Sequence, residues 1–236
     1  MRFKLLITMW VSILFLLVIN NADAKEKITV AFGEVLAPWV LSDSNRGILV
    51  DMFEAAMVPL GYEIEYLYLP YARRTKAYIA GDVDISSDMN LNTINEYELQ
   101  GFLSDIAYSY KNFAFSLRKN NYKFSQLSDL ENQSLLSWQD AAVHLGKAYA
   151  EMVNNHPQYA ETFDQSNQVK MLFLERYEVI QMDAHIFAYY RAKLAKSSVI
   201  DVSQQVDRFA LFGASDNGFL FKSEKYGTIL ISNLNG

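Results

Sequence analysis

The stretch YEIEYLYLPYARRTKAYIAGDVDISS, residues 62–87, decides the fold class of this chain. Its first part, Tyr62 to Leu69, alternates polar and apolar residues and is rich in aromatic side chains, which predicts a strand. Pro70 favours the start of a helix over Tyr71 to Ala80, and the glycine that follows favours its end. The run Val83 to Ser87 predicts a second strand. A strand, a helix and a strand in this order indicate parallel strands with a right-handed crossover, and ligands bind such sheets at the carboxyl ends of the strands.

The same patterns continue on both sides of this stretch. Before it, Ile28 to Phe32 predicts a buried strand, and apolar residues spaced by three and four from Leu49 to Leu60 predict a helix. After it, the expected strands are Tyr108 to Leu117, Leu135 to Trp138 and Val179 to Met182, the expected helices are Ala141 to Val153, Gln168 to Leu174 and Ala184 to Leu194, and Ile200 to Phe221 returns to β character. The order of the elements predicts an α/β fold.

The composition narrows the function classes. The 236 residues carry a formal net charge of −6, which leaves no basic surplus to neutralise phosphates, so nucleic acid is not an expected partner. Because the chain has no cysteine, disulfides, thiolate metal sites and cysteine nucleophiles are excluded. The three histidines, His144, His156 and His185, lack the spacing of metal ligands. We therefore expect no metal and no other cofactor, and interpret these histidines as surface or helix-capping residues.

The first 24 residues have the three parts of a secretory signal peptide. Arg2 and Lys4 precede an apolar run from Leu5 to Ile19, and the small-x-small sequence at Ala22 to Ala24 follows. The run is short for a membrane-spanning helix, although an uncleaved membrane anchor is the alternative interpretation. We predict cleavage after Ala24 and export to the periplasm.

Several short motifs, in this order, resemble family 3 of the extracellular solute-binding proteins, which includes the amino-acid-binding components of ABC transporters. These motifs are Ala37-Pro38-Trp39, Gly47 to Met52, Gly81 to Asp84, Phe102 to Tyr108, Asp129-Leu130 and Val179 to Asp183. The resemblance spans about Ile28 to Phe221. Chains of this family continue through a further helix after that point, so the resemblance implies that the final helix is trimmed here or that the sequence is incomplete.

The resemblance implies the type II periplasmic binding protein fold. In this fold, two α/β lobes, each a mixed and mostly parallel sheet flanked by helices, are joined by two crossing segments and close around a ligand in the cleft. The expected organisation is a signal peptide at 1–24, a first lobe at 25–112, a second lobe at 113–200 and a return to the first lobe at 201–236. The crossings are expected near Tyr108 to Phe115 and near Val199 to Val206. The implied protein is a monomer that binds a small molecule and meets an ABC permease in the inner membrane.

The candidate ligand-binding residues combine aromatic and charged side chains at expected strand ends and helix starts. They are Trp39, Tyr71, Arg73, Asp88, Glu96, Trp138 and Asp183. Trp39 stands where the family places an aromatic side chain on the ligand, but a core tryptophan explains it equally well. Arg73 has the chemistry to grip a carboxylate in a bidentate manner, whereas its neighbours Arg74 and Lys76 also fit a solvated helix face. Asp183 matches the acid that takes a ligand ammonium group in the family, and it also suits the cap of a following helix.

Glu96 is the main departure from the family pattern. Amino-acid binders carry a threonine followed three residues later by an arginine that clamps the α-carboxylate, and after Thr93 that place holds Glu96. An acid cannot bind a carboxylate, so a free α-amino acid becomes a doubtful ligand unless Arg73 takes over this role. With Asp88 and Asp183 nearby, the cleft suits a cationic or amine-bearing ligand stacked on Trp39 and Trp138.

No sequence motif supports catalysis. The chain lacks a G-x-S-x-G elbow, a P-loop and a G-x-G-x-x-G motif, and the segment 213–218 is interpreted as a turn between strands. We therefore expect a binding protein and not an enzyme. Two alternatives stay open: a periplasmic sensor module for a separate membrane receptor, and an enzyme similar to cyclohexadienyl dehydratase, which shares this fold.

Overall fold

The computed structural model describes residues 25–197 and 200–223 of the 236-residue chain. The signal peptide and cleavage site expected in residues 1–24, and the truncated final helix expected after Ser223, lie outside these residues. Within the described ranges, no helix has both the length and the apolar character needed to cross a membrane.

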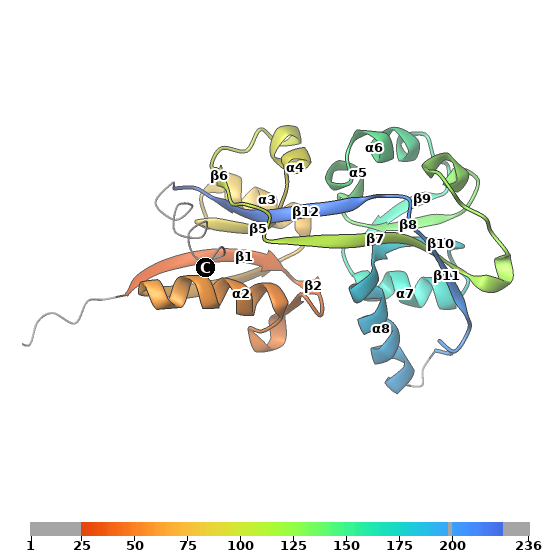
Figure 1. Cartoon of the computed structure of the whole chain (residues 1–236), viewed down its shortest axis with the longest axis horizontal. Helices are drawn as coiled ribbons and strands as arrows, with labels where there is room; N and C mark the ends of the chain where they lie inside the picture. The colour runs from red at the N-terminus through yellow and green to blue at the C-terminus, as the bar shows by residue number, and fades with distance from the viewer. Residues whose placement is uncertain (1–24, 198–199, 224–236) are drawn as a thin grey trace, which may run out of the picture.

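The structure is a mixed α/β fold of two halves (Figure 1). The strands are β1 (Glu26–Gly33), β2 (Val35–Leu36), β3 (Val40–Leu41), β4 (Tyr62–Leu69), β5 (Ile85–Met89), β6 (Phe102–Leu103), β7 (Tyr108–Leu117), β8 (Leu135–Trp138), β9 (Tyr159–Thr162), β10 (Val179–Asp183), β11 (Val206–Phe209) and β12 (Ala214–Phe221). The helices are α2 (Ile48–Met57), α3 (Tyr71–Ala80), α4 (Leu91–Glu96), α5 (Ala141–His144), α6 (Lys147–Asn154), α7 (Gln165–Phe173) and α8 (Ala184–Ser197), with short 3-10 turns at Ser42–Ser44, Val58–Leu60, Arg118–Asn120 and Leu127–Leu130.

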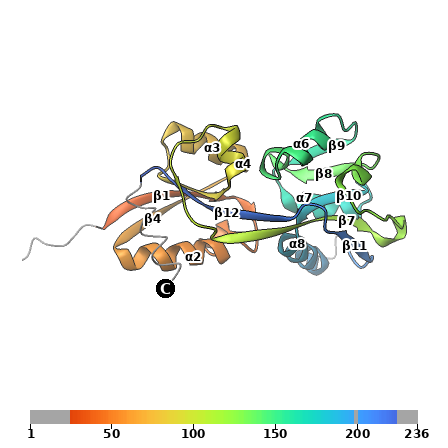
Figure 2. The same ribbon diagram turned by 45° about the horizontal axis from the view of Figure 1, so that its top comes forward.

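The first half is built on the parallel strands β4, β1 and β5, with β12 added antiparallel to β5. Successive side chains of a strand point to opposite faces, so Val30 and Phe32 pack in the same core as α2, whereas Ala31 packs with residues of α3. Figure 2 shows α2 and α3 on the two faces of these strands. The strand and helix predicted at 62–69 and 71–80 are confirmed with the same bounds.

The second half repeats this plan with the parallel strands β9, β8 and β10, and with β7 added antiparallel to β10. Leu136 and Ile180 pack with residues of α7 and α8, whereas Leu135 and Val179 pack with residues of α5 and α6. Each half therefore has helices on both faces of its sheet, as the α/β prediction requires.

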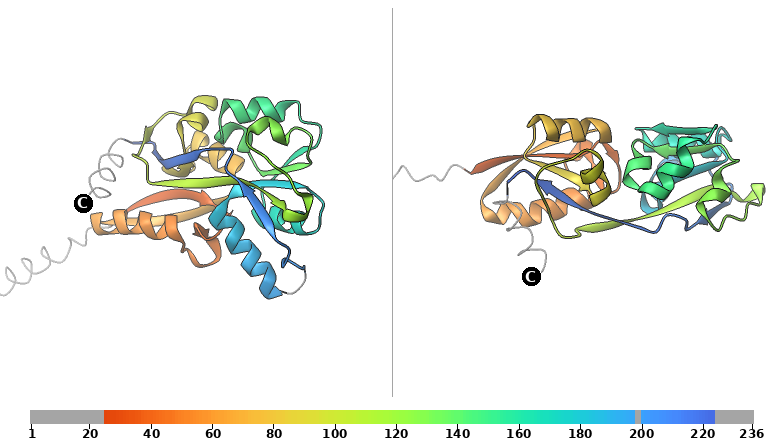
Figure 3. Two further views of the ribbon diagram at one scale, coloured as in Figure 1. Left: turned by 45° about the vertical axis from the view of Figure 1, so that its right-hand side comes forward. Right: turned by 90° about the horizontal axis from the view of Figure 1, so that it is seen from above.

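Two long strands connect the halves. β7 and β12 pair antiparallel from Tyr108 to Lys111 and from Ala214 to Asn217, and each continues into the sheet of one half. Figures 1 and 3 show these strands running from one half to the other. The first crossing lies where it was predicted. The second lies later than 199–206, because β11 still pairs with the second-half end of β7.

The lobe boundaries at 25–112, 113–200 and 201–236 stay proposals. The pairing of β11 with β7 favours moving the last boundary to the start of β12. The segment 213–218 is not the predicted turn, because most of it forms the first part of β12 and hydrogen-bonds to β7. The helix predicted over 141–153 is two helices, since Gly146, with a φ of 89°, ends the first and begins the second.

Gly47 allows the loop before α2 to approach Trp39. Its φ is 121°, and a Cβ atom there would lie 2.6 Å from the Trp39 carbonyl oxygen. We expect Gly47→Ala to lower the free energy of unfolding by about 2–4 kcal/mol, because the strained backbone and the clash add. Gly61→Ala is the matched control, since Gly61 has a φ of 89° but no atom within 4 Å of its would-be Cβ. Urea denaturation measures the free energy of unfolding of both variants. Equal losses would show that the close contact of a Cβ atom with Trp39 does not destabilise the fold.

Candidate functional site

A cavity lies between the two halves, at the carboxyl ends of the parallel strands. Gly33, Asp88, Trp138 and Asp183 stand at or beside the ends of β1, β5, β8 and β10, and all four line it. The other lining residues are Glu34, Val35, Leu36, Tyr71, Arg74, Tyr110, Asn112, Gln139, His144, Phe163, Gln165 and Ile186. The empty space is about 590 Å³ including its open mouth, and the centre of a water molecule can occupy about 60 Å³ of it. This space admits a small molecule.

A buried ion pair forms the first-lobe wall of the cavity. The Arg74 guanidinium contacts the Asp88 carboxylate, and the two side chains are 2% and 4% exposed. Asp88 has a φ of 56°, and its Oδ1 accepts hydrogen bonds from Tyr108 (2.6 Å) and Tyr110 (2.5 Å) of β7. Burial alone would raise the pKa of Asp88, but Arg74 and the two hydroxyls outweigh it and hold this pKa below its ordinary value. Asp88 is therefore a carboxylate at neutral pH.

Asp183 connects the two lobes through Trp39. Its Oδ1 accepts from the backbone N–H groups of His185 (2.9 Å) and Ile186 (3.2 Å), which makes it the cap of α8. The same oxygen accepts from Trp39 Nε1 at 3.1 Å, across the lobe boundary. Its Oδ2 accepts from the Lys111 N–H at 2.9 Å. The capping interpretation thus holds, and Asp183 also lines the cavity.

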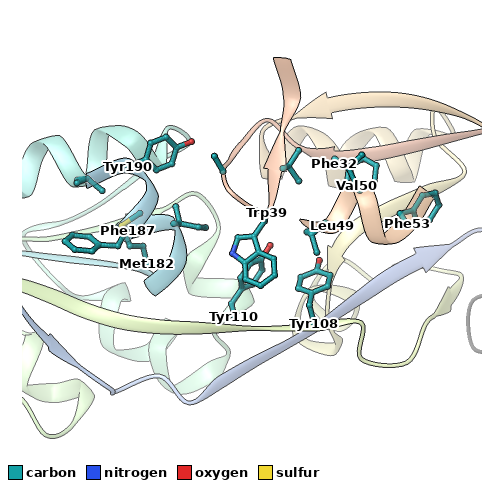
Figure 4. Close-up of a cluster of buried hydrophobic side chains, with 14 of the residues drawn as sticks. Phe32, Trp39, Leu49, Val50, Phe53, Tyr108, Tyr110, Met182, Phe187 and Tyr190 are labelled. Atoms are coloured by element: carbon teal, nitrogen blue, oxygen red, sulfur yellow. The ribbon is translucent and has the colours of Figure 1, made fainter. Parts of the chain in front are cut away.

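Trp39 packs in the core beside the cavity, so the core interpretation applies to it. The ring lies 5.8 Å from Tyr108 and 5.2 Å from Tyr110, measured between centroids. Figure 4 shows Trp39 against Tyr110, with Leu49 and Tyr108 to one side. Trp39 is 8% exposed and is not among the lining residues.

Tyr71, Trp138 and His144 form an aromatic group across the lobe boundary. Tyr71 from α3 lies 5.7 Å from the Trp138 ring and 5.5 Å from the His144 ring. The Tyr71 hydroxyl is 2.8 Å from His144 Nδ1 and 2.8 Å from Thr93 Oγ1. Burial lowers the pKa of His144 to about 4, so its ring is neutral at pH 7. The expectation of a surface or capping residue is wrong for His144, which is 2% exposed.

The structure brings four of the seven candidate residues to the cavity. These are Tyr71, Asp88, Trp138 and Asp183. Trp39 reaches it only through its hydrogen bond to Asp183. Arg73 and Glu96 are exposed on α3 and α4 and do not line the cavity.

Arg74 takes the place that the sequence interpretation assigned to Arg73. Adjacent residues of a helix point about 100° apart, and only one of the two arginines can face the sheet. A signal for the correct choice exists in the sequence, because Arg74 shares a helix face with Tyr71, Ala77 and Tyr78, at spacings of three and four. Sequence reasoning also missed His144, Gln139 and Gln165, for which no motif exists.

Three lining residues have buried polar atoms without a partner in the described part of the chain. They are Arg74 Nε, His144 Nε2 and Gln165 Oε1. A buried polar atom without a hydrogen bond is costly, so these atoms fit contact with a polar ligand or with water. Among the described residues, no three His, Asp or Glu side chains are grouped as metal ligands.

No protein-family model matches the chain, and no curated protein matches it either. Solved structures do. A histidine kinase sensor domain with similarity to periplasmic binding proteins has a TM-score of 0.73 at 14% identity, over 90% of both chains. The GluR0 ligand-binding core in complex with L-glutamate has a TM-score of 0.70 at 17% identity, over 91% of this chain and 93% of that one.

A third similar structure is an ancestral amino-acid-binding protein described as a precursor of cyclohexadienyl dehydratase, with a TM-score of 0.65 at 17% identity. The match covers 88% of this chain and 87% of that one. The element order, the crossing strands and these matches together show that the chain has the two-lobed type II periplasmic binding protein fold.

Proposed function

We propose that this chain is an exported, monomeric solute-binding protein that captures a small, polar, amine-bearing molecule between its lobes and delivers it to an ABC permease. The observation that carries the proposal is the cavity itself. Residues of both lobes line the cavity. Two hydrogen bonds between the lobes lie at the cavity, one from Trp39 to Asp183 and one from Tyr71 to His144. Closing the lobes assembles the site, which is how a binding protein couples ligand capture to a change of shape.

The charges of the lining favour a cation. Arg74 is the only arginine or lysine among the described lining residues, against Glu34, Asp88 and Asp183. Asp88 neutralises the charge of Arg74, so the cavity holds no cation without a counter-ion to attract a carboxylate, and His144 is neutral at pH 7. The excess acid attracts an ammonium group.

Aromatic faces in the lining supply the second part of the recognition. Trp138 is half-buried, Phe163 is exposed at the cavity and Tyr71 stands between Trp138 and His144. Such faces attract cations and cover the apolar part of a small ligand. A compact amine that carries an apolar or ring portion fits this combination.

Asp88 suits binding better than catalysis. A general acid needs a raised pKa so that it holds a proton at neutral pH, whereas the pKa of Asp88 is lowered. The similarity to a dehydratase precursor makes turnover worth measuring. We expect prephenate to be recovered unchanged after incubation with the protein.

A thermal-shift panel tests the proposed ligand class. Primary amines, polyamines and amino acids are compared with dicarboxylic acids, using the protein purified after export from its full-length gene. We expect amine-bearing members to stabilise it by about 3 kcal/mol at a hundredfold excess over their dissociation constant. Stabilisation by the dicarboxylic acids alone would overturn the proposal.

A sensor is the second candidate, favoured by the similarity to a histidine kinase sensor domain. Uptake of the amine identified above separates the two roles. If the protein serves a permease, deletion of its gene abolishes high-affinity uptake of that amine. If it serves a receptor, uptake continues and the transcriptional response to the amine disappears.

A further inference from the structure

Where α4 contacts α5 (Figure 1), one histidine of the second lobe makes several hydrogen bonds to the first lobe. The His144 carbonyl oxygen accepts from the side-chain amides of Asn90 and Asn92, each at 3.1 Å. Its ring nitrogen Nδ1 lies 2.8 Å from the Tyr71 hydroxyl. Nδ1 also lies 3.4 Å from Thr93 Oγ1. His144 belongs to the second lobe and these four partners to the first. Separation of the lobes therefore breaks all four contacts and exposes the imidazole to water.

The surroundings of the ring bury it almost completely in this arrangement of the lobes. Trp138 packs against the imidazole edge to face, with 5.1 Å between ring centroids. Two residues after His144, Gly146 lies close to α4, because a Cβ atom at Gly146 would be 3.0 Å from Asn92 Nδ2. The imidazole is 2% exposed. A charge on a ring in this position loses its water shell without a carboxylate in contact to replace it.

The hydrogen-bond partners fit the neutral ring. Burial raises the pKa of Tyr71, so its hydroxyl keeps its proton and can donate to His144 Nδ1. Nε2 then carries the ring hydrogen and faces the Asn217 side chain of β12. Neither Nε2 nor Asn217 Oδ1 has another partner of hydrogen-bond geometry in residues 25–197 and 200–223. A second ring proton on Nδ1 would point at the hydroxyl hydrogen of Tyr71.

The charged groups around the ring act on it in opposite directions. Asp88 of β5 favours the imidazolium and Arg74 of α3 disfavours it, but these two side chains are paired with each other. Asp216 of β12 accepts a hydrogen bond from Ser109. Asp140 precedes α5, and burial, the largest cause, raises its own pKa. Desolvation is thus the dominant influence on His144, and it lowers the pKa of this residue from 6.5 to about 4.

We propose that His144 is a pH-sensitive latch between the lobes. The neutral imidazole holds the lobes closed at neutral pH. The charged imidazolium must be hydrated, so it is stable only when the lobes separate and water reaches the ring. The lowered pKa belongs to the closed state, so closure is fully favoured above pH 6.5 and weakens as the pH falls from 6.5 toward 4. Mild acid therefore opens the protein and releases what the cavity holds.

Measurement of the distance between the two lobes as a function of pH tests the latch without any ligand. Because the chain has no cysteine, spin labels attach only to introduced ones, and Ala80→Cys and Ala192→Cys place them on exposed positions of α3 and α8. We expect the ratio of closed to open protein to fall about thirtyfold between pH 7.5 and pH 5. A distance distribution that is the same at both pH values would overturn the proposal. The proposed ligand class can fail independently, since this measurement uses none.

Variants of the histidines assign the effect. His144→Gln in the labelled protein should give one distance distribution at both pH values, because its side chain does not titrate. His156→Gln is the matched control, since His156 is a buried second-lobe histidine whose ring bonds Leu130 O of its own lobe at 3.0 Å, and it should keep the wild-type response. Circular dichroism confirms folding, and His144→Asn provides a second non-titrating variant. A wild-type pH response in either His144 variant would assign the transition elsewhere and overturn the latch.

Discussion

Arg74→Ala is expected to lower the free energy of unfolding by about 3–5 kcal/mol, the largest effect of any change considered. The substitution removes the cation that faces Asp88 and leaves a carboxylate in a site where it is 4% exposed. Removal of one partner of a buried ion pair costs this much, because the other charge stays desolvated without its counter-ion. Urea denaturation at pH 7 measures the loss.

The neighbouring arginine is the matched control. Arg73 lies on the same helix but is exposed, so Arg73→Ala should change the unfolding free energy by less than about 0.5 kcal/mol. The loss in Arg74→Ala should also shrink in acid. In the wild type the pKa of Asp88 is lowered, so its contribution is lost only as the pH falls below the ordinary carboxyl range. Without Arg74, Asp88 is free to take up a proton and become neutral at a higher pH. Equal losses in the two alanine variants would show that the buried pair does not stabilise the fold.

Asp183→Asn is expected to weaken the binding of an amine about 10- to 150-fold. This range corresponds to a charge-assisted hydrogen bond of about 1.5–3 kcal/mol. Asparagine keeps an oxygen that caps α8 and accepts from Trp39, so the lobes retain that contact. Its amide nitrogen faces the Lys111 N–H, which costs about 1–2 kcal/mol of stability. Isothermal titration calorimetry with the strongest amine of the thermal-shift panel measures the affinity.

Two further variants separate the charge of Asp183 from its structural roles. Trp39→Phe removes the hydrogen bond between the lobes and leaves the carboxylate, so we expect only a severalfold loss of affinity. Glu96→Gln removes an exposed acid outside the cavity and should bind as the wild type does. If Asp183→Asn retained wild-type affinity for every amine, Asp183 would be a helix cap and no part of the ligand site.

The local pattern of the sequence predicted most elements of the fold. Polar and apolar residues alternate over Tyr62–Leu69, which forms β4, and the helix predicted after Pro70 has the expected bounds. Where prediction failed, a neighbouring element decided. The segment 213–218 has the composition of a turn, but pairing with β7 holds it as a strand.

The candidate site was less accessible from the sequence. Aromatic and acidic residues at strand ends pointed to Asp88, Trp138 and Asp183, because the carboxyl ends of parallel strands share one edge of a sheet. Arg73 and Arg74 have the same chemistry and sit side by side. The helical spacing from Tyr71 favours Arg74, and the docking of α3 against β1 and β5 places its side chain in the site. His144 had no pattern at all, since its environment comes from α3, α4 and β12.

The sequence by itself therefore determined the order and type of the elements, because hydrophobic periodicity, prolines and glycines act within a few residues along the chain. The tertiary structure alone decided the pairings that make the site. Trp39 bonds Asp183 across 144 positions and Tyr71 bonds His144 across 73. Such contacts form only when two lobes close, and closure brings the burial that sets the charge of His144 and the hydrogen bond that Trp39 gives to Asp183.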